Sequence, residues 1–237
     1  MKQLFLLLLP ACLLVHTSCS TLTTIAKNAA SSILTEGEVV GGLKEALSKG
    51  ATNAVSQAGQ QGGFANNALL ALVFPPEVKR VEETLRSLGM NQLVDDFNGS
   101  VNRAAELAAA QAQPVLVGAV RDMSIADGWG ILRGGPNAAT QYLQTATTAQ
   151  LMEKFKPIVD NQLGQANATQ YWGDILTVYN KIPFVQPINT DLSNYVTTKT
   201  VEGLFRLIGQ EEAKIRQNPA ERTSALLKKV FSNTQSQ

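Results

Sequence analysis

The sequence predicts an all-α fold, arranged as a single compact multi-helix domain, and three observations lead to this prediction. Apolar residues recur at the 3.6-residue spacing of helices through most of the 237-residue chain. Capping residues and Gly or Pro breaks separate the periodic segments. No segment alternates apolar and polar residues with β-branched enrichment, apart from a short piece at residues 182–185. With 44% apolar residues, the chain can build a packed core without internal disulfides.

Residues 1–18 are predicted to be a bacterial lipoprotein signal peptide. Lys2 is followed by an apolar stretch over residues 4–15, and about twelve such residues are too few to span a bilayer. Small residues then precede Cys19. In lipoprotein signals, the thiol at this position receives a diacylglyceryl group, and the new terminal amine is then acylated. We therefore expect lipid attachment at Cys19 and a permanent membrane anchor.

Two alternatives to this assignment remain open. His16 stands where such signals usually carry Leu, and Cys12 also follows a similar motif, although its apolar segment is short. Ordinary cleavage near Ser18 would instead leave a free thiol at Cys19. Ser20 and Thr21 form no obvious inner-membrane retention signal, so we expect an outer-membrane lipoprotein that faces the periplasm.

The rare residues exclude several kinds of chemistry. The single His is His16 and the two Cys are Cys12 and Cys19, so the chain beyond residue 19 contains neither residue type. Catalytic His dyads and triads, zinc sites with N or S ligands, and haem or iron–sulfur ligation are therefore excluded. Twenty basic and nineteen acidic residues give a net charge of +1, which does not favour nucleic-acid binding. We expect no cofactor and no metal.

Residues 19–40, rich in Ser, Thr, Ala and Gly, are predicted to be a lipidated tether, and residues 41–233 a helical domain. Within this domain, apolar residues at helical spacing mark a series of segments. They are residues 42–58, 78–88, 91–108, 104–120, 124–132, 147–163, 169–180, 191–217 and 218–231. The stretch 104–120 is apolar on almost every face, so we expect it to be central, with a break at Pro114.

Several residues are predicted to start or end these helices. Pro76, Asn91, the Ser124/Asp127 and Thr147/Gln150 pairs, Asp191 and the run Asn218-Pro219-Ala220-Glu221 have the character of helix starts. Gly89 and Gly134-Gly135-Pro136 are stop signals, and Pro157 predicts a kink. Pro183 and Pro187 predict an extended piece between them.

Several ordered motifs together resemble the bacterial domain of unknown function family 4197. They are Gly42-Leu43-Lys44-Glu45-Ala46-Leu47, Asn102-Arg103-Ala104-Ala105-Glu106, Asp127-Gly128-Trp129-Gly130-Ile131-Leu132, Phe155-Lys156-Pro157-Ile158-Val159, Tyr195-Val196-Thr197, Gly203-Leu204-Phe205, Asn218-Pro219-Ala220-Glu221-Arg222-Thr223 and Leu227-Lys228-Lys229-Val230-Phe231. The resemblance extends over roughly residues 40–231. It implies a helical, exported and often lipid-anchored protein, and it implies no activity.

A first candidate polar site comprises Asn102, Arg103 and Glu106, at the start of the apolar stretch. The i,i+3 spacing lets Arg103 and Glu106 touch. We interpret the pair primarily as a buried structural ion pair that fixes the register of a central helix. The alternative is a polar ligand contact, or an acid whose pKa is raised by burial.

Further candidates are Asp127 with Trp129, and Glu211. Asp127 is expected to cap a helix start and Trp129 to lie in the core, with a binding role as the alternative. Glu211 continues an apolar stripe beside Glu212, and it pairs hypothetically with Glu106 as the two carboxyls of a glycoside hydrolase. Glu212 is expected to pair with Arg216. Aromatic side chains are expected to connect helices or, alternatively, to line a groove. They are Tyr142, Tyr171, Trp172, Tyr179, Phe184 and Tyr195.

The sequence therefore favours an envelope lipoprotein with a non-catalytic binding or structural role. Its expected partners are the membrane, through the lipid on Cys19, and an envelope protein or polymer, with no nucleic acid. Two alternatives remain: a carboxylate-dependent hydrolase of an envelope polymer, and a helical carrier of an apolar ligand.

Overall fold

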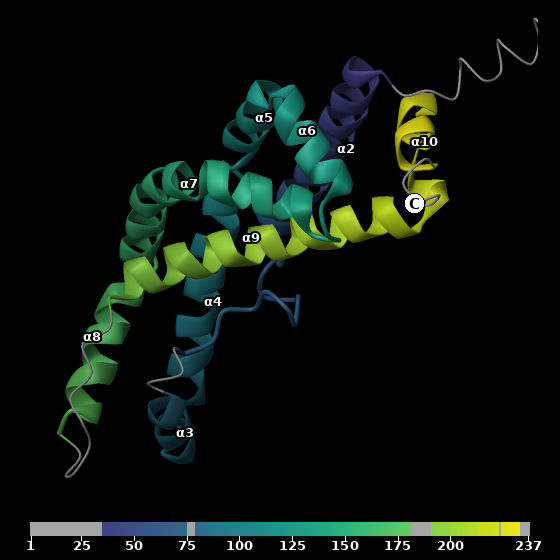
Figure 1. Ribbon diagram of the computed structural model, residues 1–237. Helices are drawn as coiled ribbons and strands as arrows, with labels where there is room; N and C mark the ends of the chain where they lie inside the picture. Colours follow the sequence, from purple (N-terminus) through teal and green to yellow (C-terminus); the bar gives the residue numbers. More distant parts are fainter. Residues whose placement is uncertain (1–34, 75–78, 182–190, 223, 233–237) are drawn as a thin grey trace, which may run out of the picture. The chain divides into compact units, whose positions relative to one another are not determined.

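All regular structure in the described residues is helical, which confirms the all-α prediction (Figure 1). The computed structural model describes residues 35–74, 79–181, 191–222 and 224–232. Its elements are α2 (Glu36–Gly59), α3 (Lys79–Ser87), α4 (Asn91–Ala109), α5 (Gln113–Asp122), α6 (Ile125–Arg133), α7 (Ala138–Gln165), α8 (Ala168–Tyr179), α9 (Leu192–Gln217), the 3-10 turn η2 (Pro219–Glu221) and α10 (Ala225–Ser232).

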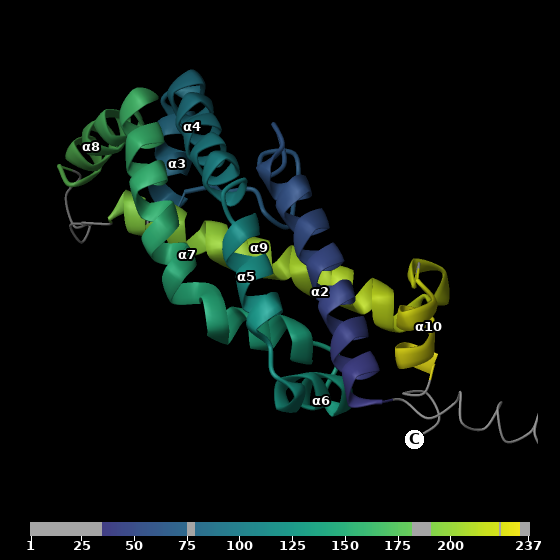
Figure 2. The ribbon, with the colours of Figure 1, turned by 90° about the horizontal axis from the view of Figure 1, so that it is seen from above.

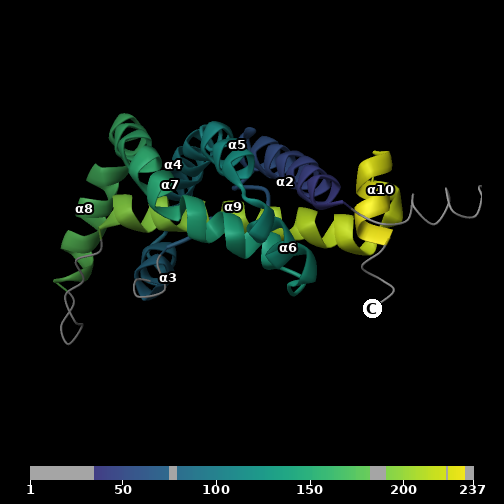
Figure 3. The ribbon, with the colours of Figure 1, turned by 45° about the horizontal axis from the view of Figure 1, so that its top comes forward.

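The long helix α9 is the central packing element of this domain. It lies across α2, α4 and α7, and all three pack against it (Figures 1 and 3). Its apolar stripe includes the buried Val201, Leu204 and Ile208, as the helical spacing predicts. The stretch predicted to be central is divided between α4, which ends at Ala109, and α5, which begins at Gln113. Pro114 lies in the first turn of α5, where a proline is tolerated.

Three predicted helix boundaries are confirmed. Ser124 and Asp127 form a capping box in which each side chain accepts a hydrogen bond from the other residue's backbone N–H. The Asp191 side chain accepts a hydrogen bond from the backbone N–H of Asn194 at the start of α9. Gly89 follows α3 with φ of +78°, a left-handed conformation that glycine adopts without a steric penalty.

Two other predicted helix starts are wrong, and a third is correct only for a short turn. Thr147 lies in the middle of α7, where its hydroxyl donates to the carbonyl of Leu143 instead of capping. Asn91 is already helical, and no side-chain hydrogen bond caps α4. Asn218 does cap a helix start, since its side chain accepts from the N–H of Ala220, but that helix is the single 3-10 turn η2, and α10 begins only at Ala225. In each case, tertiary packing decides between a cap motif and a continuing or broken helix.

Helix α2 begins at Glu36, within the stretch predicted as tether, and its Val39 is fully buried. Cys19 and the predicted signal peptide lie outside the described residues, as does the predicted extended piece at 183–187. Among the helices of the described part of the chain, none combines the length and apolar character needed to cross a bilayer.

Residues 60–74 leave the end of α2 without forming a helix and pack against α4 and α9. We call them the 60–74 segment. Phe64, Leu70, Leu72 and Phe74 are buried in it. Gly203 of α9 lets the segment approach closely, because a Cβ there would lie 3.1 Å from the ring of Phe64. An irregular segment that packs this closely needs partners for its backbone polar groups.

Candidate functional site

Asn102 on α4 supplies such partners to Leu72. Its Oδ1 accepts a hydrogen bond from the backbone N–H of Leu72 at 2.8 Å, and its Nδ2 donates to the Leu72 carbonyl, also at 2.8 Å. Both bonds are buried, so Asn102 pairs with Leu72 as a neighbouring strand would. The candidate residue Asn102 is thus an anchor for the 60–74 segment.

Glu106 lies one turn further along α4 and holds the beginning of the same segment. Its Oε1 accepts from the backbone N–H groups of Phe64 at 3.2 Å and Ala65 at 3.5 Å. Its Oε2 accepts from Arg103 at 3.3 Å, as the spacing predicts. Glu106 is 2% exposed, whereas the Arg103 side chain is 49% exposed. In this ion pair, the carboxylate is therefore buried and the guanidinium is exposed.

An open groove of about 610 Å³ lies between α4 and the 60–74 segment. Arg103, Glu106 and Gly99 form its α4 side. The segment contributes its other lining residues, which are Gln61, Gly62, Ala65 and Asn66. The Arg103 guanidinium has five N–H donors, and the hydrogen bond to Glu106 uses one of them. Arg103 has no further partner within the described part of the chain. The groove therefore offers a cation and two side-chain amides to a ligand.

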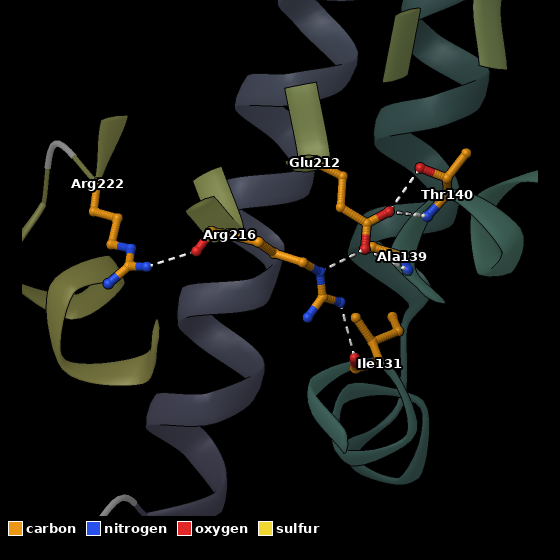
Figure 4. A network of polar contacts seen from close by, with 6 residues as sticks. All are labelled: Ile131, Ala139, Thr140, Glu212, Arg216 and Arg222. Carbon is orange, nitrogen blue, oxygen red and sulfur yellow. Dashed lines mark hydrogen bonds and ion pairs between the residues drawn. The ribbon is translucent and has the colours of Figure 1, made fainter. Parts of the chain in front are cut away.

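A second buried carboxylate, Glu212, joins α9 to the start of α7 (Figure 4). It accepts from the backbone N–H groups of Ala139 at 3.1 Å and Thr140 at 2.8 Å, and from the Thr140 hydroxyl at 2.7 Å. The first N–H groups of a helix have no partner within the helix, and they attract negative charge. Asn137, the residue at the cap position, makes no side-chain bond there. Glu212 caps α7 in its place.

Arg216 completes this junction from the next turn of α9 (Figure 4). Its Nε donates to Glu212 at 2.9 Å, which confirms the predicted i,i+4 pair. Its Nη2 donates to the carbonyl of Ile131 near the C-terminal end of α6, at 3.0 Å. The buried Arg222 in turn donates to the backbone carbonyls of Ile215 and Arg216. These groups form a structural network that ties α9 to the α6–α7 turn.

Asp127 and Trp129 lie together on α6 but do not converge on a cavity with the other candidates. A hydrogen bond from the Ser124 hydroxyl, and a second from its backbone N–H, lower the pKa of Asp127 below the ordinary value of an aspartate. Trp129 is partly exposed instead of lying in the core, and the Arg133 guanidinium lies 4.7 Å from its ring centroid.

Glu211 is held at the contact between α9 and α2. Its carboxylate accepts hydrogen bonds from Asn53 and Lys214. Burial by itself raises the pKa of Glu211, but these hydrogen bonds and the nearby charges of Lys214 and Lys49 lower it below the usual value. Among the described residues, Glu106 and Glu211 share no hydrogen-bond partner. Within the described ranges, no three His, Cys, Asp or Glu side chains gather as a metal site would require.

The aromatic residues connect helices where they are described. Phe97 of α4 stacks on Trp172 of α8, with ring centroids 5.4 Å apart, and Phe74 packs against both rings. Tyr195 donates its hydroxyl to the carbonyl of Val73. Phe184 lies outside the described residues.

The anchoring role of Glu212 at α7 and the places of Gln61 and Asn66 in the groove were not predicted from the sequence. An acidic residue on an apolar stripe was the available signal for Glu212. The polar residues of the 60–74 segment carry no such signal, because only the folded chain places them opposite Arg103.

Comparison with known proteins gives one match, which covers most of the chain. Residues 33–232 match the family described as "Protein of unknown function (DUF4197)". No curated protein and no solved structure matches. The resemblance inferred from the ordered motifs is thereby confirmed, and the chain belongs to the DUF4197 family.

Proposed function

We propose that this chain is a lipid-anchored protein of the bacterial envelope with a non-catalytic binding role. Its anchor is the lipid on Cys19, its domain faces the periplasm, and its ligand site is the groove beside Arg103. The partner is an envelope protein or polymer that presents hydrogen-bond acceptors to the guanidinium and to the amides of Gln61 and Asn66.

The observation that carries the non-catalytic role is the use of the two buried carboxylates. Glu106 and Glu212 each direct both oxygens at backbone N–H groups or an arginine of the same chain. A general acid or base must instead reach the reacting atoms of a substrate. Glu211 is likewise engaged by Asn53 and Lys214. This arrangement gives a binding protein more support than a hydrolase.

The small cavity beside Glu212 gives little support to the carrier hypothesis. It holds about 20 Å³ and is lined mainly by apolar side chains of α2 and α9. That volume accommodates about one water molecule, far below the several hundred Å³ of a ligand pocket.

Mass spectrometry of the mature protein, isolated from envelopes, tests the anchor. We expect an N-terminal peptide that begins at Cys19 and carries a thioether-linked diacylglyceryl group and an acylated amine. Cys19→Ser should abolish this mass, whereas Cys12→Ser should leave it unchanged. An unmodified thiol at Cys19, or lipid at residue 12, would overturn the proposed attachment.

Photo-crosslinking in intact cells tests the groove. A photoreactive residue in place of Gln61 should give a discrete crosslinked product, and the same probe at the exposed Gln150 of α7 should not give it. Arg103→Gln should reduce the product several-fold, because it removes the charge that faces the partner. Lys199→Gln is the matched control, since Lys199 also pairs with a Glu at i+3. Equal products from both probe positions would contradict the proposal.

A further inference from the structure

We propose that the outer face of α6 rests on the lipid bilayer to which the chain is anchored. This face consists of Ile125, Trp129 and Arg133, which follow one another at intervals of four residues along the helix. The inference rests on the proposed lipid anchor, and it adds a second, non-covalent contact between the domain and the membrane.

The composition of this face is typical of a membrane interface. Ile125 is 50% exposed, and Trp129 is partly exposed. Trp side chains are enriched at the level of lipid headgroups, because an apolar ring carries a polar N–H. Arg133 lies over that ring and is exposed, so its charge can remain in the headgroup region while its stem covers apolar surface. Gly128, Ile131 and Leu132 of the same helix are buried.

The position of α6 places this face beside the point where the tether enters the domain. A Cβ at Gly128 would lie 3.0 Å from Cγ2 of Val40, so α6 packs directly on the first turns of α2. Glu36, the first residue of α2, is only one helical turn before Val40, about 6 Å along the axis. Figure 2 shows α6 beside the purple N-terminal end of α2. The anchor thus reaches the domain next to this face.

The chain between Cys19 and Glu36 is short enough to keep the face near the bilayer. Residues 20–35 reach at most about 55 Å when fully extended. A tether of this length holds the face at a high effective concentration near the membrane. The two apolar side chains, Ile125 and Trp129, therefore suffice for a contact that they could not maintain without the tether.

The charges around the face favour an apolar contact over attraction to anionic lipid. Arg121 pairs with Asp122 at 3.5 Å, and Glu38 pairs with Lys229 at 2.7 Å. Asp127 is bonded to Ser124. Lys44 donates to the carbonyl of Arg121 at 2.6 Å, and Arg133 and Glu36 carry opposite charges, so the net charge of this region is small. We therefore expect the contact in zwitterionic vesicles, with little dependence on salt.

Quenching of Trp fluorescence by brominated lipid tests the contact, with the second Trp as an internal reference. Cys19 is the only thiol beyond the predicted signal, so the chain from residue 19 can be coupled through it to a maleimide lipid in phosphatidylcholine vesicles. Bromine near the top of the acyl chains should quench Trp129. Trp172 is 5% exposed in the core and should stay unquenched, so Trp129→Phe should abolish the effect.

Matched variants test which surface is in contact. Ile125→Ser should reduce the quenching at least about twofold, because it removes apolar surface from the face. Leu88→Ser is the control, since Leu88 is 65% exposed next to α3 and away from α6. The uncoupled chain should show no quenching at the same concentration.

Three results would overturn the proposal. The first is an unquenched Trp129 in the coupled chain, and the second is an equal loss of quenching in Ile125→Ser and Leu88→Ser. The third is shielding of Trp129 from solvent that depends on protein concentration instead of lipid, which would indicate contact with a second copy of the chain. Chemical coupling replaces the biological anchor in this experiment. A failure here therefore counts against the α6 face alone, while an unlipidated Cys19 in envelopes counts against the anchor.

Discussion

Replacing Glu212 by alanine is expected to lower the free energy of unfolding by about 3–5 kcal/mol, the range found when one partner of a buried ion pair is removed. The substitution leaves the N–H groups of Ala139 and Thr140 without an acceptor and removes the partner of Arg216. Chemical denaturation of the mature chain measures the change.

Two comparisons separate the junction from an ordinary ion pair. Arg216→Met should cost less than Glu212→Ala, because the Glu212 carboxylate keeps two backbone donors and the Thr140 hydroxyl. Glu202→Ala breaks an exposed pair with Lys199 and should change stability by less than about 1 kcal/mol. Equal losses at residues 202 and 212 would contradict the role assigned to the buried carboxylate.

Asn102→Ala is expected to lower the free energy of unfolding by about 2–4 kcal/mol, since each buried group left unpaired costs about 1–3 kcal/mol. The two groups are the N–H and the carbonyl of Leu72. Hydrogen exchange should show loss of protection at the Leu72 amide before any change in the protection of α9.

The same substitution connects stability to the proposed binding role. Release of the 60–74 segment displaces Gln61 and Asn66 from the groove, so the crosslinked product from residue 61 should fall together with the protection of Leu72. Asn161→Ala is the control, because Asn161 is exposed and bonds only to neighbouring side chains of α7 within the described residues. Unchanged protection at Leu72 in Asn102→Ala would show that Asn102 does not hold the segment.

Local signals predict an element well when the partner is close in sequence. The Ser124–Asp127 box, the Asp191 cap and the Arg103–Glu106 and Glu212–Arg216 pairs all join residues three or four apart, and all are present. The Thr147–Gln150 box has the same spacing but lies inside α7, because a helix that is packed along its length continues through a weak start signal.

Only the α4 side of the candidate groove could be predicted from the sequence. Asn102, Arg103 and Glu106 stand out because polar side chains begin an apolar helix. Their partners Phe64, Ala65 and Leu72 are bonded through the backbone, which has the same chemistry at every residue, so no sequence pattern indicates them. These backbone hydrogen bonds place the 60–74 segment as the opposite wall of the groove.

By itself, the sequence determined that the protein is all-α, and it located the helix boundaries at Gly89, Ser124 and Asp191. These properties depend on residue type and on spacing within a few turns. The tertiary structure alone decided that Glu212 caps a helix that begins more than seventy residues earlier, and that α6 packs on the first turns of α2. Such choices depend on which surfaces meet when the chain packs, and helical periodicity specifies the apolar face of each helix but not the face that it meets.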